Sequence, residues 1–190
     1  MTFNLEPVPI LSVDPGHVSG FAVFFQANNQ NNYYLARYGK MKPTKAKKTE
    51  KIIDCCVDKL VDCYEMPNKM IMLVETQYLA VTGQQGLSID KLMRLVVNRA
   101  RWEVIAERKE GLIEIKYVKP NQWQSKMLGA SRRMKRDERK ITGVRFAQSF
   151  YRGATFTPDE SDAVLMGMNQ IRVMGKQVVQ DHYPLEGERL

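Results

Sequence analysis

Four acidic residues have the types and the spacing that metal-dependent chemistry requires. Asp14 ends one apolar run of the chain, and Glu75 ends a second apolar run at 70–74. Asp159 and Asp162 are three residues apart, a spacing that places both side chains on one face of a helix. Carboxylate oxygens are the ligands that Mg²⁺ prefers, with Mn²⁺ as a workable substitute. The four acids therefore predict a divalent-metal site.

The charge of the whole chain indicates what substrate such a site would meet. Lysine and arginine number 29 against 21 aspartates and glutamates, and the formal net charge is +8. Cations bind the phosphates of a nucleic-acid backbone and offset the repulsion between that backbone and the carboxylates. A metal site in a basic chain predicts a metal-dependent nuclease.

Asp14 and Glu75 are predicted to lie at the ends of strands. Pro15 and Gly16 break the run that enters Asp14, and a second apolar run leaves from Gly20, which is the pattern of a β-hairpin. The run before Glu75 is continuously apolar, as is typical of a strand covered on both faces. Taken singly, an acid at such a position is more often a solvated strand end, so neither residue indicates a function alone.

A capped helix is predicted to carry the other two acids. Thr157 takes the N-cap position, Pro158 the first helical position, and Glu160 closes a capping box. Glu160 is explained by the helix dipole, which favours anions in the first turn. Asp162 opens an apolar stretch at 162–168, so its carboxylate needs a partner that offsets desolvation. A metal ion would be such a partner.

Together these motifs resemble the RuvC family of Holliday junction resolvases. The resemblance rests on Asp14-Pro15-Gly16, on Ser19-Gly20, on Glu75 after its apolar run, and on Asp159-Glu160-Ser161-Asp162-Ala163. It runs from about residue 8 to about residue 174 and preserves the order and spacing of the four acids. It implies an RNase H-like fold and hydrolysis of four-way or other branched DNA. Asp14, Glu75, Asp159 and Asp162 would then be the catalytic metal ligands, with one metal ion activating water and another stabilising the leaving 3′-oxygen.

Basic residues near the acids are expected to bind DNA. A cluster that follows Gly129 comprises Arg132, Arg133, Lys135, Arg136, Arg139 and Lys140. A second cluster, at 40–48, is either a DNA contact or a solvated charge run. The resemblance also implies an aromatic wedge at Tyr78, which would stack on a base of an opened junction. His17 follows the Asp14 turn, where it could touch a ligand, although a turn histidine is more often incidental.

Two features depart from the family pattern. The resemblance leads us to expect a lysine near Gln124, and Lys119 or Lys126 would have to supply that charge instead. The segment 131–140 is longer and more basic than the usual link. This favours broader cutting of branched DNA, as in some phage members of the family.

The periodicity of the chain predicts an α/β fold, an RNase H-like mixed β-sheet flanked by α-helices. An antiparallel meander is expected to consist of the strand that ends at Asp14 and the strands at 20–26 and 33–38. Further strands are expected to end at Glu75 and to span 112–118. Helices are expected at 48–65, 88–109, 122–128, 135–151 and 158–175. One nuclease domain would span residues 1–178, and residues 179–190 would form a flexible C-terminal tail.

Length and composition agree with a cytoplasmic protein of a bacterial cell or a phage-infected host. A chain of 190 residues with 44% hydrophobic residues can bury a sizeable core. No run approaches the roughly 18 apolar residues of a membrane span, and the N-terminus lacks a secretory layout. Cys55, Cys56 and Cys63 lack the paired spacing of a zinc site and are predicted to be reduced.

A two-fold homodimer is expected, because resolving a four-way junction requires paired cuts and one chain offers one acidic cluster. The predicted interface is an apolar stripe that would serve both the core and a partner: Ile89, Met93, Val96, Val97, Ala100 and Val104. If the core uses the whole stripe, the chain is a monomer that only nicks.

Two other functions remain open at this point. A non-catalytic branched-DNA-binding protein could keep the same fold, although the spacing of Asp159 and Asp162 argues against it. A relative of ATPase-type sugar kinases or chaperones would share the RNase H-like core, but those proteins need two lobes and this chain is long enough for one.

Overall fold

The computed structural model describes residues 8–26, 31–41, 47–54, 69–76, 89–109, 111–129 and 134–182. Several residues for which the sequence makes predictions lie outside these described residues: Tyr78, Arg132, Arg133, Lys42, Lys45, Cys55, Cys56 and Cys63. Most of the helix expected at 48–65 also lies outside them.

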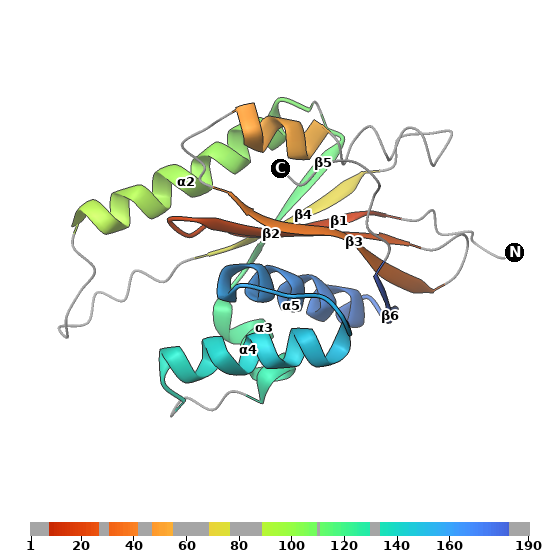
Figure 1. Cartoon of the computed structure of the whole chain (residues 1–190). Helices are drawn as coiled ribbons and strands as arrows, with labels where there is room; N and C mark the ends of the chain where they lie inside the picture. Colours follow the sequence, from red (N-terminus) through yellow and green to blue (C-terminus); the bar gives the residue numbers. More distant parts are fainter. Residues whose placement is uncertain are drawn as a thin grey trace, which may run out of the picture.

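A six-stranded mixed sheet forms the centre of the molecule (Figure 1). Its strands are β1 (Ile10–Asp14), β2 (Ser19–Gln26), β3 (Asn32–Met41), β4 (Met70–Glu75), β5 (Ile113–Val118) and β6 (Gln177–His182). They are arranged in the order β5-β4-β1-β2-β3-β6. The first three strands are antiparallel, whereas β4, β5 and β6 each run parallel to a neighbour. The structure confirms the predicted α/β class, the meander and the mixed sheet.

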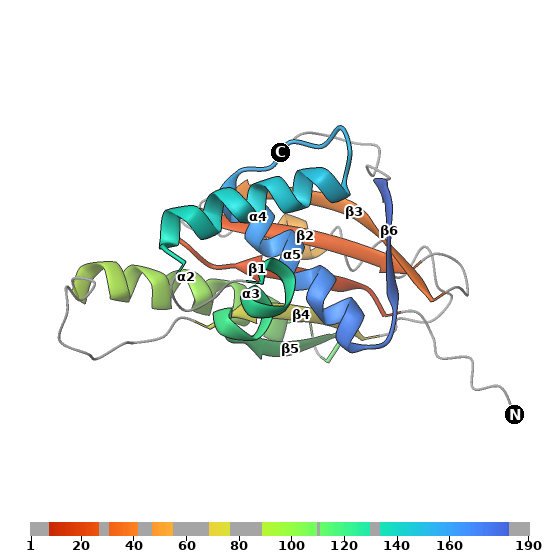
Figure 2. The ribbon, with the colours of Figure 1, turned by 90° about the horizontal axis from the view of Figure 1, so that it is seen from below.

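Helices cover both faces of this sheet (Figures 1 and 2). On one face lie α2 (Ile89–Glu107) and the helical residues 47–54. On the other lie α3 (Pro120–Leu128), α4 (Arg136–Phe150) and α5 (Pro158–Val173). Most predicted helix ends agree within two residues, which is the usual uncertainty of such boundaries. Within the described ranges, no helix combines the length and the apolar character that a membrane span needs.

Alternation along the central strands separates two cores. Ile10 of β1 joins the core beneath α3 and α5, whereas Leu11 and Val13 join the core beneath α2. Because successive side chains of a strand point to opposite faces, a strand with helices above and below it is apolar throughout. This explains why the runs before Asp14 and Glu75 are continuously apolar.

Small residues allow α5 to lie close against the sheet. A Cβ atom on Gly167 would overlap the ring of Phe24 and the hydroxyl of Ser12. The Ser12 hydroxyl in turn donates a hydrogen bond of 2.7 Å to the backbone carbonyl of Ala163. Buried polar groups need such partners, so this bond fixes α5 on β1.

The helix α2 differs from the prediction in which face it buries. Its core face consists of Asn98, Trp102, Ile105 and Ala106, each 5% exposed or less. The predicted stripe lies elsewhere on the helix, and four of its members are exposed: Met93, Val96, Val97 and Val104. The expectation that one stripe would serve both the core and a partner is therefore wrong. The large indole of Trp102, which the stripe omitted, dominates the real core face.

The structure adds a strand that the sequence analysis did not predict. β6 pairs in parallel with β3, with Tyr33 opposite Val178 and Leu35 opposite His182. The sheet therefore continues past Val178, and residues 179–182 extend β6 beyond the domain boundary expected at 178. The charged and polar composition after Val178 concealed the strand, because an edge strand needs few apolar residues.

Candidate active site

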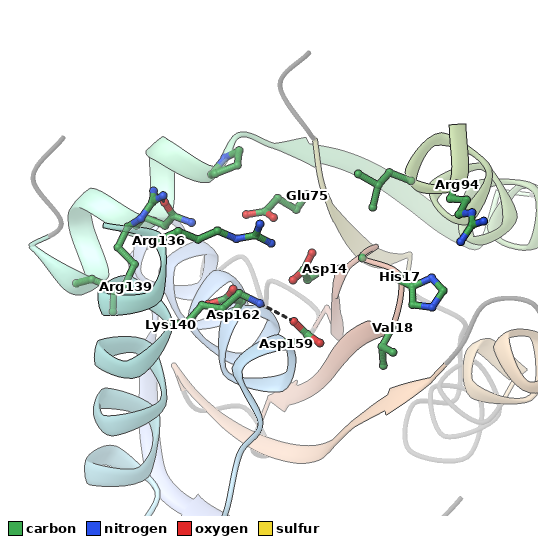
Figure 3. Close-up of a pocket in the computed structure, with 15 residues that line it drawn as sticks. Asp14, His17, Val18, Glu75, Arg94, Arg136, Arg139, Lys140, Asp159 and Asp162 are labelled. Atoms are coloured by element: carbon green, nitrogen blue, oxygen red, sulfur yellow. Dashed lines mark hydrogen bonds and ion pairs between the residues drawn. The ribbon is translucent and has the colours of Figure 1, made fainter. Parts of the chain in front are cut away.

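All four predicted acids line one pocket, with a volume of about 840 Å³ (Figure 3). Asp14 and Glu75 enter it from the ends of β1 and β4, and Asp159 and Asp162 from the first turns of α5. The fold therefore brings together residues that come from three distant parts of the sequence.

Strand register explains why Asp14 and Glu75 are neighbours. β1 and β4 are adjacent and parallel, and Val13 pairs with Val74, so both strands end at the same level. Side-chain alternation then places both acids on the face covered by α5, since Ile10, Ile71 and Leu73 belong to that core. The shared edge of parallel strands thus gathers two carboxylates.

A glycine brings the other two acids to this edge. Gly20 pairs with Asp14 across the hairpin of β1 and β2. A Cβ atom on Gly20 would overlap the backbone carbonyl of Asp159. The start of α5 therefore rests directly on β2 beside Asp14, an approach that only glycine permits. The predicted capping box is present, with Glu160 accepting hydrogen bonds from the amide and the hydroxyl of Thr157.

Glu75 is nearly buried and is held by a tryptophan. Glu75 is only 9% exposed, and Trp123 Nε1 donates a hydrogen bond of 2.8 Å to its Oε1 atom. Burial raises the pKa of Glu75 to about 7, while the hydrogen bond from Trp123 acts in the opposite direction. Trp123 was not predicted from the sequence, because nothing in its local pattern indicates that its indole reaches β4.

Asp14 and Asp162 are also difficult to ionise. Burial, followed by the charges of Glu75, Asp162 and Asp159, raises the pKa of Asp14 well above its usual value. Burial raises the pKa of Asp162 to about 6, and Lys140 partly opposes that change. Carboxylates crowded in this way are destabilised as anions, and a bound cation would relieve both the desolvation and the repulsion.

Lys140 is the protein's own cation in this cluster. Its Nζ atom donates a hydrogen bond of 2.9 Å to Oδ1 of Asp159. Burial by itself would lower the pKa of Lys140, but this bond and the charges of Asp159, Asp162 and Asp14 outweigh it and raise the pKa. The lysine is therefore charged at neutral pH.

Arg136 and Arg139 line the same pocket from α4 (Figure 3). Arg139 Nη1 donates a hydrogen bond of 2.9 Å to Oε1 of Gln124. Gln124, where the resemblance leads us to expect a lysine, thus holds an arginine from the next helix. Lys119 and Lys126, proposed as replacements, are not among the pocket-lining residues of the described ranges, and neither is Lys135.

The opposite wall of the pocket includes His17, Val18, Arg94 and Leu95. His17 thus borders the pocket, where its place in the turn after Asp14 suggested that it could touch a ligand. Arg94 was not identified from the sequence. Its charge is one of several on α2, and its contact with the pocket depends on how α2 is anchored, which no local pattern encodes.

The donor set fits a hard divalent cation in its chemistry, since all four side chains offer carboxylate oxygens. Among the described residues, however, no three His, Cys, Asp or Glu side chains stand so that they could together hold a metal ion. Ligation would therefore require side-chain movement.

Solved structures share this fold at low sequence identity. "T. thermophilus RuvC in complex with Holliday junction substrate" is 15% identical, with a TM-score of 0.55 over 88% of this chain and 96% of that one. "Thermus thermophilus RuvC structure" is 16% identical, with a TM-score of 0.54 over 89% and 98% of the two chains. The resolvase of a Fowlpox virus complex with substrate Holliday junction DNA is 15% identical, with a TM-score of 0.50 over 89% and 100%. No protein-family model matches the chain, and no curated protein matches it.

Proposed function

We propose that this chain is a metal-dependent endonuclease of the RuvC type, which resolves Holliday junctions and related branched DNA by hydrolysing phosphodiester bonds. The observation that carries the proposal is the pocket itself, in which four carboxylates face two arginines and a lysine. A site that only bound DNA would gain nothing from carboxylates that repel phosphate. The shared fold with resolvases whose structures contain Holliday junction DNA supports the same substrate.

Asp14, Glu75, Asp159 and Asp162 would hold Mg²⁺, or Mn²⁺ in its place. Metal ions held by these residues would supply two kinds of chemistry, the activation of water for attack on phosphorus and the stabilisation of the leaving 3′-oxygen. The chain's own contribution is to gather the four carboxylates in one pocket and to hold Glu75 in one orientation through Trp123.

The cations of α4 would bind the phosphate being cut. Arg136, Arg139 and Lys140 border the acids, and arginine forms paired hydrogen bonds to phosphate oxygens. We assign further DNA binding to the remaining basic residues of the prediction: Lys119, Lys126, Arg132, Arg133 and Lys135. Tyr78 would stack on a base at the opened crossover, a contact of about 1–3 kcal/mol.

The exposed face of α2 supports a homodimer. Met93, Val96, Val97 and Val104 are between 42% and 55% exposed. Since the sheet does not use this face, it is available to a second copy, and a two-fold axis would provide two equivalent sites. Paired cuts at a four-way junction need such an arrangement.

Incubating the protein with Mg²⁺ and a synthetic four-way junction tests the proposal, with a linear duplex of the same sequence as the reference substrate. We expect symmetric cleavage of the junction by the wild type. Asp14→Asn, Glu75→Gln and Asp162→Asn should each nearly abolish cleavage while junction binding persists or strengthens, because one repulsive charge is removed.

Binding without cleavage by the folded wild type, with either Mg²⁺ or Mn²⁺, would favour the non-catalytic reading. Wild-type cutting by Asp162→Asn would reject the assignment of the site. Nucleotide binding in place of junction binding would revive the relation to sugar kinases and chaperones.

A further inference from the structure

A cation lies across the pocket from α4. Figure 3 shows Arg94 and His17 on one side of the acids and Arg136, Arg139 and Lys140 on the other. The carboxylates occupy the space between these two walls. A ligand centred on the acids would therefore meet positive charge in two directions.

The place of Arg94 is built into the fold by hydrogen bonds of α2. Asn98 Nδ2 donates a bond of 3.0 Å to the carbonyl of Gly16, and Trp102 Nε1 donates one of 3.2 Å to Ser19 Oγ. Both acceptors belong to the turn and strand that follow Asp14. The helix is thus tied at two points to the segment that carries the first acid.

Arg94, Asn98 and Trp102 follow one another at intervals of four residues, which places them on one ridge of the helix. The two anchors therefore also determine the direction in which Arg94 extends. One turn before Asn98, the ridge passes the end of the sheet, and Arg94 reaches the pocket beside His17.

Among the residues that the structure describes, Arg94 has no partner that would account for its charge. Within the described ranges it forms no ion pair, and its residue is exposed. Arg99 on the same helix differs, because it pairs with Glu103 at 3.0 Å and lies over the ring of Tyr117. Arg99 has a structural role, whereas the charge of Arg94 faces the pocket.

We propose that Arg94 binds a backbone phosphate of the strand being cut, on the opposite side of the scissile phosphate from the cations of α4. The inference rests on the proposed function and specifies how the substrate lies. The strand would cross the acids with the scissile phosphate held by α4 and a flanking phosphate held by Arg94. Contacts to phosphates fix the register of a nucleic acid on a protein, so this pair would select which phosphate lies over the carboxylates.

The test compares Arg94→Gln with Arg101→Gln on the full-length protein. Arg101 is on the same helix but does not line the pocket, so the two variants lose equal charge at different places. Binding to a four-way junction is measured by fluorescence anisotropy in EDTA, over a series of salt concentrations. We expect Arg94→Gln to bind about tenfold more weakly and to lower the salt slope by about one, with a much smaller effect from Arg101→Gln.

Neutral methylphosphonate linkages then locate the phosphate. One linkage is replaced at a time along the cut strand, on one side and then the other of the cleavage position. At a single position flanking the cut, the replacement should weaken binding by the wild type but have no further effect on Arg94→Gln. Arg94→Lys should retain part of the affinity and show the same position, because it keeps the charge without the guanidinium fork.

The outcomes separate the two proposals. If the wild type binds and cuts junctions but Arg94→Gln behaves like Arg101→Gln at every linkage, the role of Arg94 is rejected and the function stands. If the wild type neither binds nor cuts branched DNA, both are rejected. Loss of the methylphosphonate effect at one flanking linkage in Arg94→Gln alone establishes the contact.

Discussion

Lys140 and Asp159 form an ion pair, with 2.9 Å between Nζ and Oδ1, at the edge of the acid cluster. A protein cation thus occupies one of the carboxylates that the proposed function assigns to metal. A metal ion would compete with Lys140 for Oδ1 of Asp159. If the metal binds this oxygen, the ammonium of Lys140 becomes free to contact a phosphate. Both partners are about 30% exposed, so solvent screening keeps the pair weak enough to exchange.

Removing the charge of Lys140 should strengthen metal binding in the absence of DNA. We expect Lys140→Met to bind Mn²⁺ several-fold more tightly, since both a competitor and a repulsive charge are lost. Junction binding should weaken in the same variant. Calorimetric titration with Mn²⁺ measures the first effect. Lys176→Met is the control, because Lys176 bonds Asn31 far from the pocket. Weaker binding of Mn²⁺ by Lys140→Met would contradict the competition.

The stability of the metal-free protein should fall as the pH rises from about 4 to about 7. Asp162 and Glu75 have pKa values of about 6 and about 7 in the fold, above the roughly 4 of unfolded carboxyls. The folded state therefore binds more protons in this range, so the free energy of unfolding decreases with pH.

Urea denaturation in EDTA at several pH values measures this slope. Glu75→Gln should have a shallower slope, whereas Asp90→Asn, at an exposed acid of α2, should keep that of the wild type. Mg²⁺ should restore stability most strongly above pH 7, where the carboxylates are ionised. A free energy of unfolding that rises between pH 5 and pH 7 would contradict the prediction.

Trp123→Phe should move the pH dependence of cleavage. The hydrogen bond from Trp123 lowers the pKa of Glu75, so its loss should raise that pKa and shift the acidic limb of the rate profile to higher pH. Trp102→Phe is a matched control, since this equally buried indole bonds Ser19 on the other side of the sheet. Both variants should lose about 1–3 kcal/mol of stability. If the acidic limb of the rate profile is unchanged in Trp123→Phe, the hydrogen bond from Trp123 does not control the pKa of Glu75.

Gly20→Ala should separate the two halves of the acid cluster. The added methyl would overlap the carbonyl of Asp159 and push the start of α5 away from β2. We expect the free energy of unfolding to fall by about 1–3 kcal/mol. Cleavage should be lost even under conditions in which the variant is fully folded. Gly143→Ala should be tolerated, because its Cβ would have its nearest neighbours at an ordinary 3.5 Å. Wild-type cleavage by Gly20→Ala would mean that α5 can adjust at no cost.

A charge on the exposed face of α2 should abolish the proposed dimer. Val97→Glu should not disturb the packing of the core, since Val97 is 42% exposed. Sedimentation of the wild type at micromolar concentration should show a dimer, and of Val97→Glu a 21.9 kDa monomer that nicks junctions without paired cuts. A wild-type monomer both with and without junction DNA would reject the dimer.

The sequence predicted the elements whose pattern is local and periodic. The runs before Asp14 and Glu75 indicated buried strands, and Thr157 with Glu160 indicated the start of α5, so the four acids could be placed before the fold was known. Contacts between elements were not accessible in this way. The bonds from Trp123 to Glu75 and from Arg139 to Gln124 depend on how α3 and α4 pack, which no periodicity encodes.

The same limit explains the errors. On α2, apolar residues lie on more than one face, and the period alone could not show that Trp102 and not Val97 is buried. β6 has a polar sequence and exists because β3 offers it a free edge, which is a property of the sheet and not of residues 177–182.

The contact between the start of α5 and Gly20 also determines when the four acids can come together during synthesis. Asp14 and Glu75 leave the ribosome early, but Asp159 and Asp162 are among the last residues of the described domain to emerge. Contacts between such distant segments form late, after the intervening chain has closed. A nascent chain therefore carries no complete set of four acids, and any cutting that depends on all of them begins only once the translated domain has closed on itself.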